Sequence, residues 1–192
     1  MPIAIKNDKA DLSSEKQTEE LALKFLNKLK PGNKVFLYGE MGVGKTTFVR
    51  YLINGFQKKN KLILTEVTSP TFNLLSEYSI NNLTIKHYDL YRLKNEMELD
   101  SLGLFEEEPD TITLVEWPEI IKRDLKNLVK LYFSYENDYQ KRFVQMSSPS
   151  YLCNLADNVP FLKTETIDLA NVLKYVRLAN KKIQCFDLQK RK

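Results

Sequence analysis

The chain has 192 residues, with 29 basic and 25 acidic side chains and a formal net charge of +4, a length that suits one domain with its own core. It contains no apolar stretch near the roughly 20 residues that span a bilayer, and residues 1–6 lack a signal-peptide core, so we expect a cytoplasmic protein without membrane segments. Two cysteines, Cys153 and Cys185, and a single histidine, His87, exclude a disulfide framework and a histidine-based metal site.

The basic excess lies entirely in the last part of the chain. Residues 149–192 carry 8 basic and 4 acidic side chains, whereas residues 1–148 carry 21 of each. A neutral body with a basic C-terminal end indicates a weak contact with RNA or an acidic partner. A solvated helix face with a frayed end accounts for the same charges equally well.

The first predicted element is a helix after Ser14, because Ser14 and Gln17 have the spacing of a capping box. Pro31-Gly32 end this helix, and its apolar face consists of Leu21, Ala22, Phe25, Leu26 and Leu29. The apolar run Val35–Tyr38 then predicts a buried strand. A second helix runs to Gly55, with an apolar face of Phe48, Val49, Leu52 and Ile53.

The rest of the chain predicts two antiparallel hairpins on either side of another buried strand. In chain order these elements are a connector or short strand (60–65), a hairpin (Thr71–Tyr78 and Leu83–Tyr88), a helix (Glu96–Leu102), a buried strand (Ile112–Val115) and a second hairpin (Leu128–Tyr135 and Arg142–Met146). Ser147–Ser150 is a linker by composition. We therefore expect a domain over 1–148 and a basic C-terminal extension over 149–192. Apolar residues at helical spacing predict that this extension is helical and docked on the domain; they include Ile167, Ala170, Leu173 and Val176.

The segment after the first buried strand fits the phosphate-binding P-loop pattern at every required position. Its glycines let the backbone turn tightly and bring N–H groups to a phosphate, Lys45 supplies a positive charge, and Thr46 offers a hydroxyl to Mg²⁺. The helix that follows points its positive end at the same anion. The motif predicts a site for a nucleoside triphosphate and Mg²⁺, formed by Gly39, Glu40, Met41, Gly42, Val43, Gly44, Lys45, Thr46 and Thr47.

Two carboxylates follow strands that we expect beside this loop. Glu116 comes directly after the buried strand, in the position of a Walker-B acid, and Asp89 closes a strand of the first hairpin. Such acids hold Mg²⁺ and orient the attacking water or hydroxyl. An ordinary strand-end carboxylate is the alternative for each, and it is the weaker alternative for Glu116.

Several classes of P-loop protein are disfavoured by what the sequence lacks. It has no guanine-reading element of a GTPase, no transporter signature and no acid before Glu116 that would complete a helicase-like pair. The absence of an arginine-rich lid argues against a nucleoside or shikimate-type kinase. A small ATPase remains. The predicted fold is α/β, a P-loop NTPase fold with a mixed central sheet, helices on both faces and antiparallel hairpins, plus the C-terminal helical extension.

In their residues and in their order, the motifs resemble those of the TsaE family, formerly called YjeE. This family is the ATPase component of bacterial threonylcarbamoyladenosine tRNA modification. The resemblance runs from about Ser14 to Ser148. Five segments carry it: Tyr38–Thr47, Ser69–Leu74, His87–Leu93, Leu102–Leu104 and Leu114–Glu119.

The resemblance implies a cytoplasmic ATPase that is weak alone, a monomer or weak oligomer, and more active with a TsaB–TsaD-type pair. That pair adds threonylcarbamoyl to the adenosine next to the anticodon of tRNAs reading codons that begin with A, and ATP hydrolysis resets it between turnovers. Lys45 and Thr46 are then expected to hold phosphate and Mg²⁺. Asp89 and Glu116 are expected to hold Mg²⁺ and to orient the hydrolytic water, and the resemblance leaves open which carboxylate has which task.

The resemblance also implies roles for four further residues. Thr71 lies in a segment that behaves like a switch loop, and Trp117 is expected to sense the nucleotide or to be a packed aromatic. Arg92 is expected near the γ-phosphate or a partner, or as an ordinary surface residue. Glu15 matches an N-terminal acid near the nucleotide.

This sequence departs from the family pattern in its last hairpin and beyond. A glycine–arginine pair that is common in that hairpin is replaced by Tyr139–Arg142, which leaves a nucleotide contact there open. The extension is a candidate for docking, for tRNA binding or for partner recruitment. Two other functions stay in view: a small-molecule P-loop kinase and a nucleotide-switched RNA-binding module.

Overall fold

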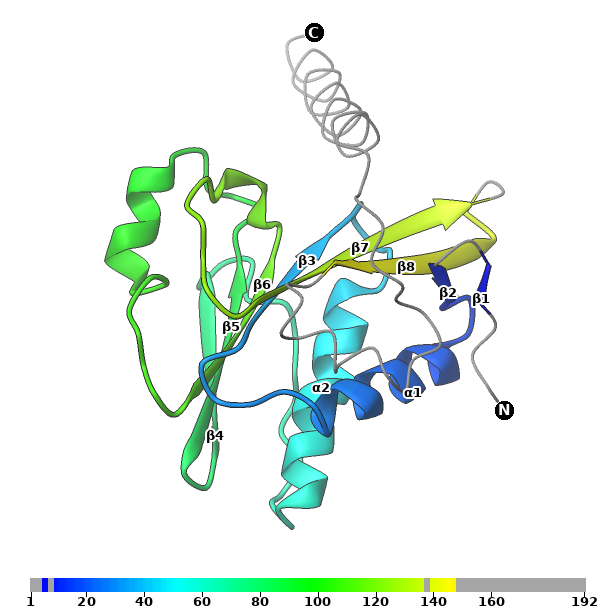
Figure 1. Cartoon of the computed structure of the whole chain (residues 1–192), viewed down its shortest axis with the longest axis horizontal. Helices are drawn as coiled ribbons and strands as arrows, with labels where there is room; N and C mark the ends of the chain where they lie inside the picture. The colour runs from blue at the N-terminus through cyan, green and yellow to red at the C-terminus, as the bar shows by residue number, and fades with distance from the viewer. Residues whose placement is uncertain (1–4, 7–8, 137–138, 148–192) are drawn as a thin grey trace, which may run out of the picture. The chain divides into compact units, whose positions relative to one another are not determined.

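The computed structural model describes residues 5–6, 9–136 and 139–147, and within them eight strands form one sheet (Figure 1). The order across the sheet is β1-β2-β8-β7-β3-β6-β5-β4. The strands are β1 (Ile5–Lys6), β2 (Lys9–Asp11), β3 (Lys34–Tyr38), β4 (Leu75–Ile80), β5 (Leu83–Asp89), β6 (Thr111–Glu116), β7 (Leu128–Glu136) and β8 (Lys141–Ser147).

The centre of the sheet is parallel and its margins are antiparallel. β7, β3, β6 and β5 pair in parallel, whereas β4 and β8 add antiparallel neighbours on either side. Every residue of β6 is buried, as expected for a parallel strand covered on both faces. The predicted mixed sheet of an α/β protein is therefore confirmed.

Both α-helices cover one face of this sheet, α1 (Glu15–Leu26) beside α2 (Lys45–Lys59) (Figure 1). The predicted capping box is present, since Ser14 and Gln17 exchange hydrogen bonds at the start of α1. The opposite face packs against two short 3-10 helices, η1 (Glu96–Leu102) and η2 (Pro118–Ile120), and the segments around them. The helix predicted over Glu96–Leu102 is thus a 3-10 helix, which ends where Gly103 takes a left-handed conformation (φ 65°).

Several predicted boundaries were wrong: α1 already ends at Leu26, before Pro31-Gly32, and α2 runs past Gly55 to Lys59. Residues 60–65, predicted as a connector or a short strand, form a connector, in which the side chain of Gln57 bonds both the backbone and the hydroxyl of Thr65. The first hairpin begins at Leu75 rather than Thr71, because Leu74 has a positive φ (65°) and bonds back to Pro70 in a turn.

The predicted C-terminal extension, 149–192, lies outside the described residues. No helix in the described ranges is long and apolar enough to cross a membrane.

Candidate functional site

The site lies where the parallel strands end. Carboxyl ends of parallel strands meet at the same edge of a sheet, which is where open α/β sheets bind ligands. Here β3 runs into the P-loop, β5 ends at Asp89 and β6 ends at Glu116. The register pairs Asp89 with Glu116, and Leu37 with Glu116, so both predicted carboxylates stand beside the start of the loop.

Two glycines of the loop have conformations that other residues do not tolerate. Gly39 has a φ of 136°, and a Cβ there would lie 2.5 Å from the carbonyl oxygen of Phe133. Gly44 has a φ of 108° and forms the N-cap of α2 without a side chain that could accept a hydrogen bond. The N–H groups of the first turn of α2 therefore have no side-chain cap, which suits an anion at this helix end.

Lys45 turns its ammonium group back into the loop. The residue is 4% exposed, and its Nζ donates to the carbonyl oxygens of Gly39 at 2.7 Å and Glu40 at 3.0 Å. The same nitrogen lies 3.8 Å from the ring centroid of Trp117, a cation–π distance. Burial lowers the pKa of Lys45, and the nearby Glu116 carboxylate opposes that shift. The partners of the ammonium group are thus two neutral carbonyl oxygens, and an anion bound in the loop would form stronger hydrogen bonds with it.

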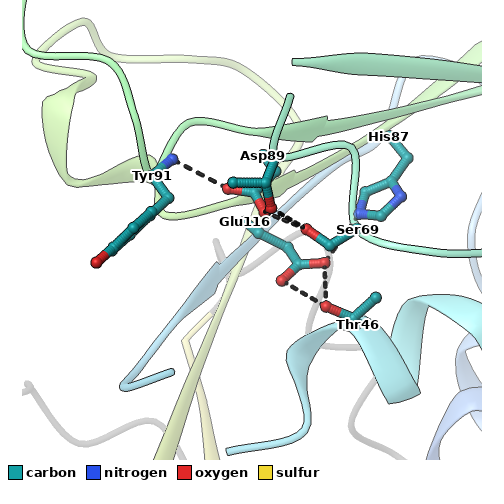
Figure 2. Close-up of polar contacts among 7 residues, drawn as sticks. Thr46, Ser69, His87, Asp89, Tyr91 and Glu116 are labelled. Carbon is teal, nitrogen blue, oxygen red and sulfur yellow. Dashed lines mark hydrogen bonds and ion pairs between the residues drawn. The ribbon is translucent and has the colours of Figure 1, made fainter. Parts of the chain in front are cut away.

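Glu116 is held between two side chains from regular elements (Figure 2). The hydroxyl of Thr46, in the first turn of α2, lies 2.9 Å from each carboxylate oxygen. Nε2 of His87, inside β5, lies 2.9 Å from Oε1 of Glu116. The Glu116 side chain is 3% exposed and that of His87 is 0% exposed. This carboxylate is therefore buried, fully paired and joined to the P-loop through Thr46.

Asp89 is held mainly by the loop before β4 (Figure 2). The hydroxyls of Ser69 and Thr71 both donate to Oδ2, the Thr71 bond measuring 2.8 Å. The N–H of Tyr91 donates to Oδ1 at 3.0 Å. The predicted switch residue Thr71 is thus joined directly to the predicted catalytic Asp89.

The aromatic residues near the loop form a connected group. Trp117 follows Glu116 in a left-handed conformation (φ 57°), which is uncommon outside glycine and asparagine. Its ring contacts Lys45 on one side and Tyr91 on another, with the Tyr91 centroid at 4.9 Å. Arg92 lies over the ring of Phe72 at 4.5 Å, and Phe72 is 81% exposed. Trp117 therefore contacts the lysine of the P-loop, and Arg92 contacts Phe72, the residue after Thr71.

The predicted residue Glu15 contacts α2 beyond the first turn of that helix. Its carboxylate binds Arg50 and Tyr51, both at 2.9 Å, on the second turn of that helix. Met41 is exposed at the tip of the P-loop, whereas Val43 is buried beneath it.

Three residues near the site were not predicted from the sequence as site residues. Ser69 and His87 stood within the quoted motifs, which was the available signal, but the sequence did not pair them with Asp89 and Glu116. Arg142 comes from the last hairpin, where its Nη1 lies 3.6 Å from the position that a Cβ on Gly44 would take. Its Nη2 donates to the carbonyl of Ser13 at 3.1 Å, so the guanidinium lies between the P-loop and the start of α1.

The arrangement combines a phosphate cradle, a buried ammonium, a hydroxyl–carboxylate pair and a second carboxylate. The described residues contain no group of three or more His, Cys, Asp and Glu side chains that could hold a metal by themselves. Mg²⁺ bound with phosphates needs only one or two carboxylates, because phosphate and water oxygens complete its shell. Thr46, Glu116 and Asp89 suit that kind of shared site.

Comparisons with known proteins agree with this geometry. The sequence model of the family described as "Threonylcarbamoyl adenosine biosynthesis protein TsaE" matches residues 12–144. The chain is 47% identical over 116 residues to the tRNA threonylcarbamoyladenosine biosynthesis protein TsaE of Rickettsia bellii, covering 60% of this chain and 78% of that one. It is 40% identical over 157 residues to the protein of that name from Rickettsia felis, covering 80% and 90%.

A solved structure shows the same fold. The crystal structure of Bacillus subtilis YdiB superposes with a TM-score of 0.61 at 21% sequence identity, covering 79% of this chain and 93% of YdiB.

Proposed function

The chain belongs to the TsaE family of threonylcarbamoyladenosine biosynthesis, and we propose that it is the ATP-hydrolysing subunit of the cytoplasmic machinery that adds threonylcarbamoyl to tRNA. In this proposal the chain binds ATP with Mg²⁺ and works with a TsaB–TsaD-type pair. Hydrolysis resets that pair between turnovers.

The single observation that carries the ATPase proposal is the state of Lys45. A buried ammonium group donates to two carbonyls inside a glycine loop, next to a helix end that has no side-chain cap. Burying a cation is costly unless it is paired, and the anionic phosphates of ATP are the partner for which this cradle has the right groups. The residues present therefore fit the triphosphate.

The residues also fit Mg²⁺, which when bound would neutralise charge that develops on the phosphates. Thr46 and Glu116 are the side chains that would hold it, because a P-loop hydroxyl and a Walker-B acid share this task in P-loop proteins and here they are hydrogen-bonded at 2.9 Å. Asp89 is left to orient the attacking water. Its contacts with Ser69 and Thr71 place it beside a loop that could respond to the nucleotide.

Lys45 and Trp117 connect nucleotide binding to the surface. In this proposal the ammonium exchanges the Gly39 and Glu40 carbonyls for phosphate, and the ring of Trp117, which contacts both Lys45 and Tyr91, responds to that change. Arg92 follows Tyr91 and lies over the exposed ring of Phe72, next to Thr71. This connected, partly exposed group is the surface that we assign to the partner proteins.

The first experiment measures phosphate release from ATP and from GTP, with and without the purified TsaB–TsaD pair. The wild type is compared with Lys45→Ala and with Lys58→Ala, a control that removes an exposed lysine from the last turn of the same helix. We expect ATP-selective release that rises with the partners and is lost in Lys45→Ala only. The amount of threonylcarbamoyladenosine formed in a reconstituted tRNA reaction should likewise be lost in Lys45→Ala and retained in Lys58→Ala.

Two results would contradict the proposal. Equal release by Lys45→Ala and the wild type would separate hydrolysis from the P-loop. Turnover that ignores the partners would favour a small-molecule kinase, which a screen of acceptor substrates would then test.

A further inference from the structure

His87 is a buried polar side chain at the site to which the proposed reaction gives no role. It lies on β5 two residues before Asp89, so both side chains are on the same face of the strand. The side chain is 0% exposed, and Nε2 lies 2.9 Å from Oε1 of Glu116 (Figure 2). The ring thus approaches the carboxylate from within the sheet, while Thr46 approaches it from α2.

The surroundings of the ring select one arrangement of its protons. Nδ1 of His87 is buried and has no hydrogen-bond partner among the described residues. A neutral imidazole carries its proton on only one of the two ring nitrogens. A carboxylate oxygen is purely an acceptor, so Nε2 must donate to it. The geometry therefore selects the tautomer with its proton on Nε2.

We propose that His87 is a positioning residue that holds the Glu116 carboxylate in its working orientation. The inference rests on the proposed ATPase function. Thr46 has a second task there, because its hydroxyl is also assigned to the metal, whereas Nε2 of His87 has Glu116 as its partner. His87 is thus free to restrain Glu116 while Thr46 serves the metal. Partners that orient metal ligands in this way are worth about 10- to 100-fold in metal affinity or activity.

The first test separates the N–H donor from the space that the ring fills. His87→Gln keeps an N–H donor that can reach Glu116, and His87→Leu fills the site without one. Tyr88→Phe is the matched control, since Tyr88 is the next residue on the same strand, is buried on the opposite face and donates to the Leu102 carbonyl. Steady-state phosphate release gives kcat, the KM for ATP and the Mg²⁺ concentration at half-maximal rate, and thermal melting confirms that each variant is folded.

We expect His87→Leu to raise the half-maximal Mg²⁺ concentration about 10-fold and to lower kcat, with the KM for ATP nearly unchanged. His87→Gln should recover most of that loss, and Tyr88→Phe should behave like the wild type. A folded His87→Leu with wild-type kcat and Mg²⁺ dependence would overturn the proposal. So would equal losses in the Leu and Gln variants, because a ring that only fills space has no need of a donor.

The second test does not depend on activity. His87 is the single histidine of the chain, so one pair of imidazole ¹⁵N resonances in an NMR spectrum belongs to it without further assignment. We expect the pattern of the Nε2–H tautomer and a slowly exchanging ring proton whose shift changes in Glu116→Gln. A ring without a proton on Nε2, or a ring spectrum that Glu116→Gln leaves unchanged, would overturn the inference. If the wild type failed to hydrolyse ATP, the proposed function would fall, and this spectrum would still decide whether His87 holds Glu116.

Discussion

Asp89 and Glu116 end neighbouring parallel strands in register, yet different kinds of structure hold the two carboxylates. Glu116 is bound by Thr46 in the first turn of α2 and by His87 inside β5. Asp89 receives its side-chain bonds from Ser69 and Thr71, which lie in a turn before β4. One carboxylate is thus fixed by the core of the sheet and helix, and the other is fixed by a loop.

This difference indicates a division of labour. Helices and strands that bury many apolar side chains open rarely, whereas surface loops open at much lower free energy. Phe72, the residue after Thr71, is 81% exposed, and the guanidinium of Arg92 lies over its ring. Glu116 is therefore suited to a role that stays constant, such as holding a metal. Asp89 is suited to a step that the loop switches on or off.

The largest expected effect is that of Asp89→Asn. The substitution keeps the shape of the side chain but removes the charge that would orient and polarise water, and general-base contributions are typically about 10²- to 10⁴-fold. We expect kcat for phosphate release to fall within that range, while the half-maximal Mg²⁺ concentration stays near that of the wild type. Asp110→Asn, at the exposed residue before β6, is the control. A shift of the Mg²⁺ dependence without a loss of kcat would reverse the two roles.

Glu116→Gln should give the complementary result. Because Glu116 shares the Thr46 hydroxyl, we expect the half-maximal Mg²⁺ concentration to rise at least about 10-fold, with a smaller loss of kcat at saturating Mg²⁺. A titration of phosphate release with Mg²⁺ measures both quantities, and Glu107→Gln, at an exposed acid in the segment before β6, is the control. If both site variants lost kcat equally and neither changed the Mg²⁺ dependence, the distinction between the two carboxylates would not hold.

Most of what the sequence predicted here depends on residues close together in the chain. The P-loop, the capping box at Ser14 and the acid directly after a buried strand are patterns within a few residues, and their geometry follows from local backbone rules. The parallel centre of the sheet then brings the strand ends to one edge, because crossover connections carry each strand in the same direction.

The contacts that distinguish the two carboxylates could not be predicted in this way. His87 and Glu116 are 29 residues apart, and Ser69 and Asp89 are 20 apart, so each contact depends on strand order and register rather than on spacing. The wrong start of the first hairpin has a related cause. Leu74 takes a positive φ that its residue type does not favour, so the turn containing Thr71 was predicted as strand.

The smallest expected effect tests the loop itself. Thr71→Val keeps the shape of the side chain and removes one donor to Asp89, while Ser69 and the Tyr91 N–H continue to donate. Hydrogen bonds to charged groups contribute about 1.5–3 kcal/mol, and with two donors left we expect the lower end of that range in the free energy of unfolding, measured with urea. The rate of phosphate release should fall only about 3- to 10-fold, because Asp89 keeps its charge while the loop holds it less firmly.

Thr68→Val is the matched control, because it makes the same change at an exposed position three residues earlier. Hydrogen exchange makes the comparison direct. Amides around residues 69–73 should exchange faster in Thr71→Val, while those of the first turn of α2 and of β6 should not change. Equal acceleration in all these segments would mean that the loop and the Glu116 side of the site open as one unit, and Asp89 could then not be switched separately.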